Sequence, residues 1–115
     1  MRVAVVGPRG YGKMELVRQY VRGLPADTVV VSGGTLGVDD TAVSEAKLCG
    51  LATTVYLPEW AKYGKSAGFK RNVLIVKDAD VVVAFWDGRS KGTKHSMDLA
   101  VSLGKPLITP EETNE

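Results

Sequence analysis

The 115-residue sequence predicts an α/β protein, a three-layer Rossmann-like sandwich in which helices cover both faces of a five-stranded parallel sheet. Short apolar runs, mostly of β-branched residues, recur along the chain and are typical of strands buried on both faces. Segments with apolar residues at helical spacing separate these runs. Right-handed strand–helix–strand crossovers then place helices on both sides of the sheet.

The strands are expected at residues 3–6, 29–31, 53–57, 81–85 and 106–108. Four helices are expected between them, and Gly50 and Gly104 follow the second and fourth helices as stop signals. The apolar positions of the helices, in chain order, are Met14, Val17, Val21 and Leu24, then Val38, Ala42, Ala46 and Cys49, then Phe69, Val73 and Val76, and last Met97, Ala100 and Val101.

Length and composition predict one domain over residues 1–109, followed by a flexible acidic tail at 110–115. The 15 Lys and Arg nearly balance the 13 Asp and Glu, which argues against extensive nucleic-acid contact but leaves a local basic patch open. With one Cys and one His there is no signal for zinc or haem, and the cofactor is unknown; Mg²⁺ would enter through ligand phosphates. No leader or membrane-spanning segment is visible, so we expect a cytoplasmic protein without membrane contact.

Glycine-rich turns follow three of the expected strands, at residues 7–12, 32–39 and 86–93. In an open α/β sheet, ligands bind beyond the carboxyl ends of the strands, near the switch in strand order. Glycine lets the backbone approach a ligand closely, although short strand-to-helix turns need glycine in any case. We therefore expect the three turns to form one ligand pocket.

The first turn has the glycine and lysine spacing of a P-loop, with Gly7, Gly12 and Lys13 in register. Where a P-loop supplies a Ser or Thr for Mg²⁺, this chain has Met14. A thioether cannot replace a hydroxyl on a hard cation. The sequence therefore predicts that the turn helps to hold an anion and does not hydrolyse ATP.

Several motifs together resemble the SLOG (Smf/DprA-LOG) superfamily, with the closest likeness to its small YspA/YpsA-type branch. They are G-P-R-G, S-G-G-x-x-G-x-D, Y-G-K-x-A-G-x-x-R-N at residues 63–72, A-D-x-V-x-A-F, x-G-T and G-K-P. The resemblance covers residues 2–108. It implies a Rossmann-like fold that binds nucleotides, nucleotide-derived signals or nucleotide sugars, and it is compatible with a homodimer or a larger homo-oligomer.

The resemblance also implies a set of ligand-binding residues: Gly7, Arg9, Gly10, Ser32, Gly33, Gly34, Gly37, Asp39, Arg71, Asn72, Gly92 and Thr93. Their chemistry suits an anion, because helix N-termini and an arginine both favour negative charge. Asp39 either accepts a hydrogen bond from a ribose hydroxyl or caps its own helix. Arg71 either clamps a phosphate or lies solvated on a helix face.

An enzyme is the first alternative. The chain resembles phosphoribohydrolases that cleave nucleoside monophosphates, but these carry P-G-G-x-G-T-x-x-E, and the Glu position is Ser96 here. Cleavage of a glycosidic bond needs a carboxylate, which leaves Asp39 and Asp87 as the candidate catalytic residues. The sequence favours a binding module over an enzyme.

Binding of single-stranded nucleic acid is the second alternative, because the DNA-processing protein A branch of the superfamily binds single strands. Residues 60–71 interleave lysines with Tyr63 and Phe69, as such binding requires. Phe69 falls on the apolar face of its helix, however, and the net charge is small. The favoured prediction is therefore a sensor or binding module for a nucleotide-type small molecule.

Overall fold

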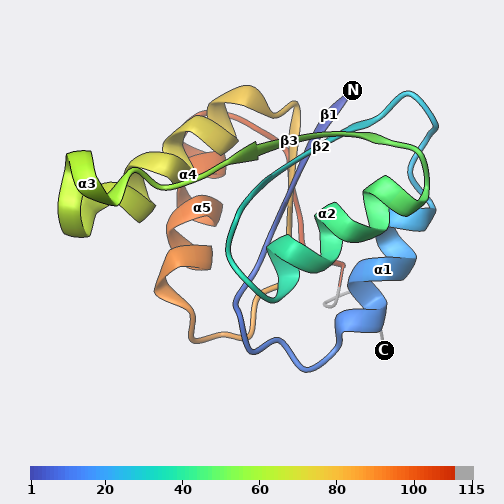
Figure 1. Cartoon of the computed structure of the whole chain (residues 1–115), viewed down its shortest axis with the longest axis horizontal. Helices are drawn as coiled ribbons and strands as arrows, with labels where there is room; N and C mark the ends of the chain where they lie inside the picture. The colour runs from blue at the N-terminus through green and yellow to red at the C-terminus, as the bar shows by residue number, and fades with distance from the viewer. Residues whose placement is uncertain (111–115) are drawn as a thin grey trace.

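The computed structural model describes residues 1–110, and Figure 1 shows the arrangement of its elements. The strands are β1 (Arg2–Val6), β2 (Val29–Gly33), β3 (Ala52–Tyr56), β4 (Val81–Ala84) and β5 (Leu107–Ile108). The helices are α1 (Met14–Arg22), α2 (Val38–Leu48), α3 (Trp60–Tyr63), the 3-10 helix η1 (Gly64–Ser66), α4 (Ala67–Asp78) and α5 (Lys91–Ser102). The predicted acidic tail lies, apart from Pro110, outside the described residues.

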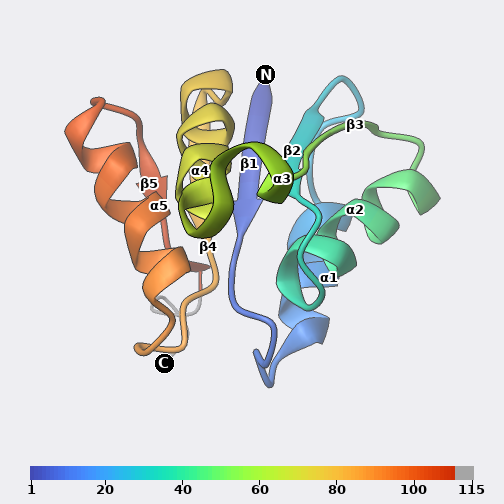
Figure 2. The ribbon, with the colours of Figure 1, turned by 60° about the vertical axis from the view of Figure 1, so that its left-hand side comes forward.

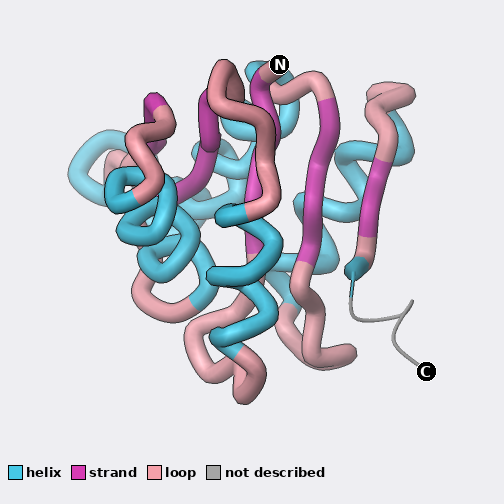
Figure 3. Tube along the Cα trace, turned by 90° about the vertical axis from the view of Figure 1, so that its right-hand side faces the viewer, coloured by secondary structure: helices cyan, strands magenta, loops and turns pink. Residues whose placement is uncertain are grey.

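The five strands form one parallel sheet in the order β3-β2-β1-β4-β5. Figure 3 shows the strands side by side. The chain moves outward from β1 to β3, then returns to the other side of β1 with β4 and ends at the edge with β5. The predicted fold class is confirmed. The strand order switches between β1 and β4, which is where a ligand site is expected in such a sheet.

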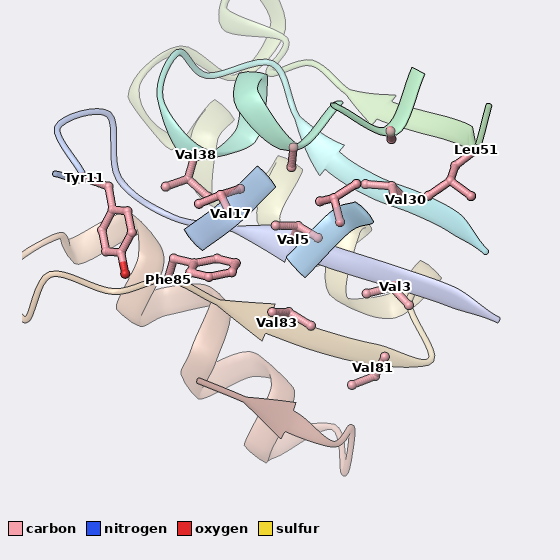
Figure 4. Packing of buried hydrophobic residues seen from close by; sticks show 13 residues of the cluster. Val3, Val5, Tyr11, Val17, Val30, Val38, Leu51, Val81, Val83 and Phe85 are labelled. Atoms are coloured by element: carbon pink, nitrogen blue, oxygen red, sulfur yellow. The ribbon is translucent and has the colours of Figure 1, made fainter. Parts of the chain in front are cut away.

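Helices cover both faces of the sheet, with α1 and α2 on one face and α4 and α5 on the other (Figure 2). Side chains along β1 alternate between the two cores, because successive residues of a strand point to opposite faces. Val3 and Val5 pack in the core under α1 and α2, where Val17 lies over the sheet (Figure 4). Ala4 and Val6 pack in the core under α4 and α5.

In the β3 region one expectation is wrong, and two short elements were not predicted. The β3 strand was expected to be buried on both faces, but it is an edge strand that pairs only with β2, and its Val55 is 40% exposed. The segment after β3 also forms α3 and η1, which the sequence periodicity did not predict because the two elements are only four and three residues long. In Figure 1, α3 projects from the body of the molecule.

Candidate functional site

A pocket of about 140 Å³ lies at the carboxyl ends of the central strands. Its walls come from the β1–α1 turn, the start of α2, the first half of α4 and the start of α5. Seven predicted ligand residues line it: Gly7, Arg9, Asp39, Arg71, Asn72, Gly92 and Thr93. The fold therefore brings together residues from all three glycine-rich turns and from α4.

Five other predicted residues, Gly10, Ser32, Gly33, Gly34 and Gly37, do not line the pocket. The side chain of Ser32 is fully buried, and its hydroxyl donates to the Val5 carbonyl at 2.6 Å. Gly34 packs against the side chain of Leu57. Gly10 is exposed, with open space around it.

Gly33 and Gly37 are needed for packing around the pocket. A Cβ on Gly33 would lie 2.5 Å from Nη1 of Arg71 and 2.8 Å from Oδ2 of Asp39. A Cβ on Gly37 would lie 2.5 Å from Cα of Arg9, and Gly37 also has a positive φ of 97°, which favours glycine. These two glycines do not line the pocket, but they leave room for Arg71, Asp39 and Arg9, which do.

Asp39, in the first turn of α2, is only 6% exposed. No side chain caps α2, so the structure gives Asp39 no capping role at that end. Burial raises the pKa of Asp39 to about 7, although the charge of Arg71 and the backbone N–H groups of Gly7 and Gly33 act in the opposite direction. Its Oδ1 atom has no hydrogen-bond partner in the described part of the chain.

Arg71 comes from α4 and is half-buried. Its Nε donates to Oδ1 of Asn72 at 3.1 Å, and its Nη2 donates to the hydroxyl of Thr35 at 3.4 Å. Its Nη1 is buried and has no partner within residues 1–110. Burial lowers the pKa of Arg71 and the charge of Asp39 opposes this, but a guanidinium remains charged at neutral pH.

The start of α5 forms another wall of the pocket. Ser90 caps this helix, because its hydroxyl accepts from the Thr93 N–H at 3.2 Å. Its carbonyl accepts from the Lys94 N–H at 3.2 Å. The residue-by-residue prediction did not include Thr35, Ser90 or Ser96, although all three line the pocket. A serine just before a helix is a recognised start signal, and it could have indicated Ser90.

The P-loop-like turn contributes to two different pockets. Gly7 and Arg9 line the first, whereas Gly12 and Lys13 line a second cavity of about 510 Å³. Asp87 also lines this second cavity, and its Oδ1 accepts from two backbone N–H groups of its own turn, each at 2.8 Å. These bonds lower the pKa of Asp87. Asp87 and Asp39, the two candidate catalytic carboxylates, therefore line different pockets.

A basic and aromatic surface adjoins the first pocket. The ring of Tyr63 has the ammonium groups of Lys62 and Lys70 at 5.1 and 4.9 Å from its centroid. Tyr63 and Lys70 line a third pocket of about 120 Å³, and Arg71 lines both this pocket and the first. Trp60, in α3, is 59% exposed nearby along the chain.

Within residues 1–110, no three His, Cys, Asp or Glu side chains gather in a way that could hold a metal ion. In the same part of the chain, none of the helices has the length and apolar character needed to cross a membrane.

Solved structures with the same fold support the predicted SLOG fold. The chain superposes on DNA processing protein A from Streptococcus pneumoniae with a TM-score of 0.81 and 24% identity, and on the protein TM1055 with 0.70 and 23%. DNA processing protein A from Helicobacter pylori, whose structure was described for its mode of binding single-stranded DNA, gives 0.65 and 26%. These matches cover 92%, 92% and 93% of this chain and 48%, 71% and 63% of the respective neighbours. The chain thus spans about half of the first neighbour and less than two thirds of the third.

No family model matches the sequence. A curated relative does: the Gene 61 protein of Mycobacterium phage D29 is 41% identical over 90 residues, which cover 73% of this chain and 72% of the relative. An identity of this size over most of both chains indicates shared ancestry, and the chain belongs to the family of the phage D29 Gene 61 protein.

Proposed function

We propose that this chain is a binding module whose first pocket takes a nucleotide or a nucleotide-derived ligand. The observation that carries the proposal is that the side chains of Asp39 and Arg71 are not fully hydrogen-bonded. Both line the pocket, and each has one buried polar atom without a hydrogen-bond partner among the described residues. Such an atom costs about 1–3 kcal/mol, so a buried polar atom without a partner needs an explanation, and a ligand that binds it provides one.

The two side chains suit a ligand that carries both an anion and hydroxyl groups. The Arg71 guanidinium and the N-terminus of α5 attract phosphate oxygens. The Asp39 carboxyl can accept a hydrogen bond from a hydroxyl group. A sugar phosphate, as in a nucleotide, provides both groups.

The size of the pocket limits how much of the ligand it can hold. Its volume is about 140 Å³, whereas pockets that enclose a whole drug-sized ligand have roughly 300–1,000 Å³. The pocket therefore fits the sugar-phosphate part. The heterocyclic base would lie outside it, where the ring of Tyr63 or of Trp86 is available for stacking.

Binding is favoured over catalysis because the pocket has a single carboxyl. Ser96, at the position where the resembling phosphoribohydrolases carry Glu, is 2% exposed and lines the pocket. A hydroxyl cannot stabilise an oxocarbenium-like state as a carboxylate does. Incubation with adenosine 5′-monophosphate should therefore release no adenine above background; release that depends on Asp39 would replace this proposal with a hydrolase.

The binding test is a thermal-shift and calorimetry panel of adenosine 5′-monophosphate, ADP-ribose and UDP-glucose. At about 100 times its Kd, a bound ligand should stabilise the chain by about 2.7 kcal/mol. Arg71→Gln should abolish the shift. Lys47→Gln is the control, because Lys47 is exposed in the last turn of α2 and does not line the pocket. Absence of any shift, or equal loss in both variants, would contradict the proposal.

Single-stranded nucleic acid is a second candidate. The Helicobacter pylori neighbour binds single-stranded DNA, and here the Tyr63 ring with its two lysines adjoins the first pocket through Arg71. Fluorescence anisotropy of a labelled oligonucleotide over a salt series separates the candidates. Steeply salt-dependent binding that Lys70→Gln weakens, with no response to mononucleotides, would favour nucleic acid.

A further inference from the structure

Asn72 connects three parts of the proposed site. It lies on α4 and is 7% exposed. Its Nδ2 donates to the Gly92 carbonyl at 3.3 Å, in the first turn of α5, and lies 3.3 Å from Nδ1 of His95, one turn further along α5. Its Oδ1 accepts from Nε of Arg71 at 3.1 Å.

The partners of Asn72 fix the orientation of its amide. A backbone carbonyl such as that of Gly92 can only accept a hydrogen bond, and the guanidinium of Arg71 can only donate. The amide nitrogen must therefore face Gly92 and the amide oxygen must face Arg71. A flipped amide would place two acceptors together at Gly92 and two donors together at Arg71.

The orientation of Asn72 in turn determines which ring nitrogen of His95 carries the proton. The Asn72 amide nitrogen carries two N–H groups, and one of them is used by the Gly92 carbonyl. The other faces Nδ1 of His95, so Nδ1 must be the atom that accepts. The neutral ring then carries its proton on Nε2.

We propose that His95 is a positioning residue of the pocket, whose Nδ1 lone pair holds Asn72 in the orientation that presents its oxygen to Arg71. A second proton on the ring would place an N–H on Nδ1, opposite an N–H of Asn72. Two donors cannot share a hydrogen bond, so Asn72 must turn away or the ring must move. If Asn72 turns, Arg71 loses its Nε acceptor; if the ring moves, the contact between α4 and α5 loosens. This inference concerns the regulation of the proposed ligand site.

The surroundings of His95 favour the neutral ring. Phe69 of α4 packs edge-on against it, with 4.6 Å between ring centroids. Burial lowers the pKa of His95, whereas the charge of Asp98 on α5 acts in the opposite direction. Lys94 of α5 pairs with Asp98 at 3.1 Å and so offsets this charge, and the Arg71 cation on the far side of Asn72 also disfavours an imidazolium. The transition should therefore occur on the acid side of neutrality.

The test uses NMR, because His95 is the single histidine of the chain and its signals are unambiguous. Long-range ¹H–¹⁵N spectra at pH 8 should show the proton on Nε2, and the Arg71 Nε–H signal should be visible. On acidification this signal should be lost together with titration of the ring. A proton on Nδ1 at pH 8, or an Arg71 signal that is indifferent to His95, would overturn the inference without bearing on ligand binding.

Variants of His95 and Asp98 test whether the ring controls the hydrogen bond between Asn72 and Arg71. His95→Gln provides an acceptor oxygen that does not titrate, so it should keep the Arg71 signal at acid pH. His95→Ala leaves one Asn72 N–H without an acceptor, so it should weaken the Arg71 signal at every pH. Asp98→Asn should lower the pKa of His95 and leave its tautomer unchanged. Sulfate, whose charge is constant over this range, serves as the anion probe.

Below the pKa of His95, the wild type should bind sulfate about tenfold more weakly than His95→Gln, the scale of one charged hydrogen bond. Equal affinities with a normal Arg71 signal would overturn the regulatory role. If the tautomer is as expected but neither protein binds sulfate, the proposed anion site itself fails. The regulatory role of His95 then fails with it.

Discussion

At the scale of single residues, Asp39 lines the pocket, but its buried carboxyl lowers the stability of the fold when it ionises. Burial raises its pKa from 3.8 to about 7. Between these two values the folded chain holds a proton that the unfolded chain has released. The contribution of Asp39 to the free energy of unfolding is therefore highest below about pH 4, where Asp39 is protonated in both states, and it falls as the pH rises to about 7. Above that, an ionised carboxylate with an unpartnered Oδ1 remains buried.

Asp39→Asn removes the charge but keeps an acceptor oxygen at the same place. At pH 8 the variant should be more stable than the wild type, on the order of 2 kcal/mol, and the two should be nearly equal at pH 4. Urea denaturation at both pH values measures this. A constant difference between the two proteins would mean that the carboxyl does not titrate as the structure implies.

Gly33→Ala tests whether the glycine behind the pocket is required. The added methyl would lie 2.5 Å from Nη1 of Arg71 and 2.8 Å from Oδ2 of Asp39, so both side chains must move. We expect a loss of about 1–3 kcal/mol of stability, as for other overpacked sites, together with weaker ligand binding. Gly10→Ala, where nothing lies within 4 Å, is the control and should change stability by less than about 0.5 kcal/mol. Equal effects of the two changes would contradict this role for Gly33.

At the scale of elements, the strands were predictable because each is a short apolar run, and the four long helices because apolar residues recur in them at helical spacing. The valines of β4 are buried throughout, and the apolar positions Val17 and Val21 of α1 both enter the core. The α3–η1 segment was missed because periodicity needs more than one helical turn. Edge exposure of β3 was missed because it depends on strand order, which one sequence does not determine.

The same difference of scale applies to the site. The turns after the strands could be located because parallel strands end at one edge of a sheet. Which residues face the pocket depends on side-chain partners, and these are not visible in a motif. Ser32 bonds inward to β1, and Gly33 supports its neighbours. His95 does not line the pocket but contacts Asn72, which does.

Ser90→Ala tests the start of α5 as an element. Its hydroxyl satisfies the Thr93 N–H, so loss of the cap should cost about 1 kcal/mol and fray the helix end at the pocket. Ser90→Asp keeps an acceptor and should restore stability. Ser66 precedes α4 without a side-chain cap, so Ser66→Ala is the matched control and should cost less. Urea denaturation measures all three, and an equal cost for both alanine changes would count against capping.

At the scale of the whole molecule, the sheet has two halves that meet where β1 pairs with β4. The strands β2 and β3 lie on one side of this junction, and β5 lies on the other. The pocket crosses the junction, because α2 and α4 pack on the side of β2 and β3, whereas α5 packs on β4 and β5. The Val38 N–H donates to the Pro8 carbonyl at 3.2 Å, which ties the start of α2 to the β1–α1 turn. A ligand would therefore bridge both halves.

Hydrogen exchange tests whether a bound ligand stabilises both halves of the sheet. If the bound state requires both halves, a ligand at about 100 times its Kd adds about 2.7 kcal/mol to global unfolding and slows exchange of core amides by about 100-fold. With adenosine 5′-monophosphate as the probe, Val30 of β2 and Val83 of β4 should slow equally, although neither lines the pocket. Arg71→Gln should remove both effects together. Slowing confined to one side of the β1–β4 junction would mean that the ligand engages one half of the sheet, because a core that unfolds as one unit transmits binding energy to every amide it protects.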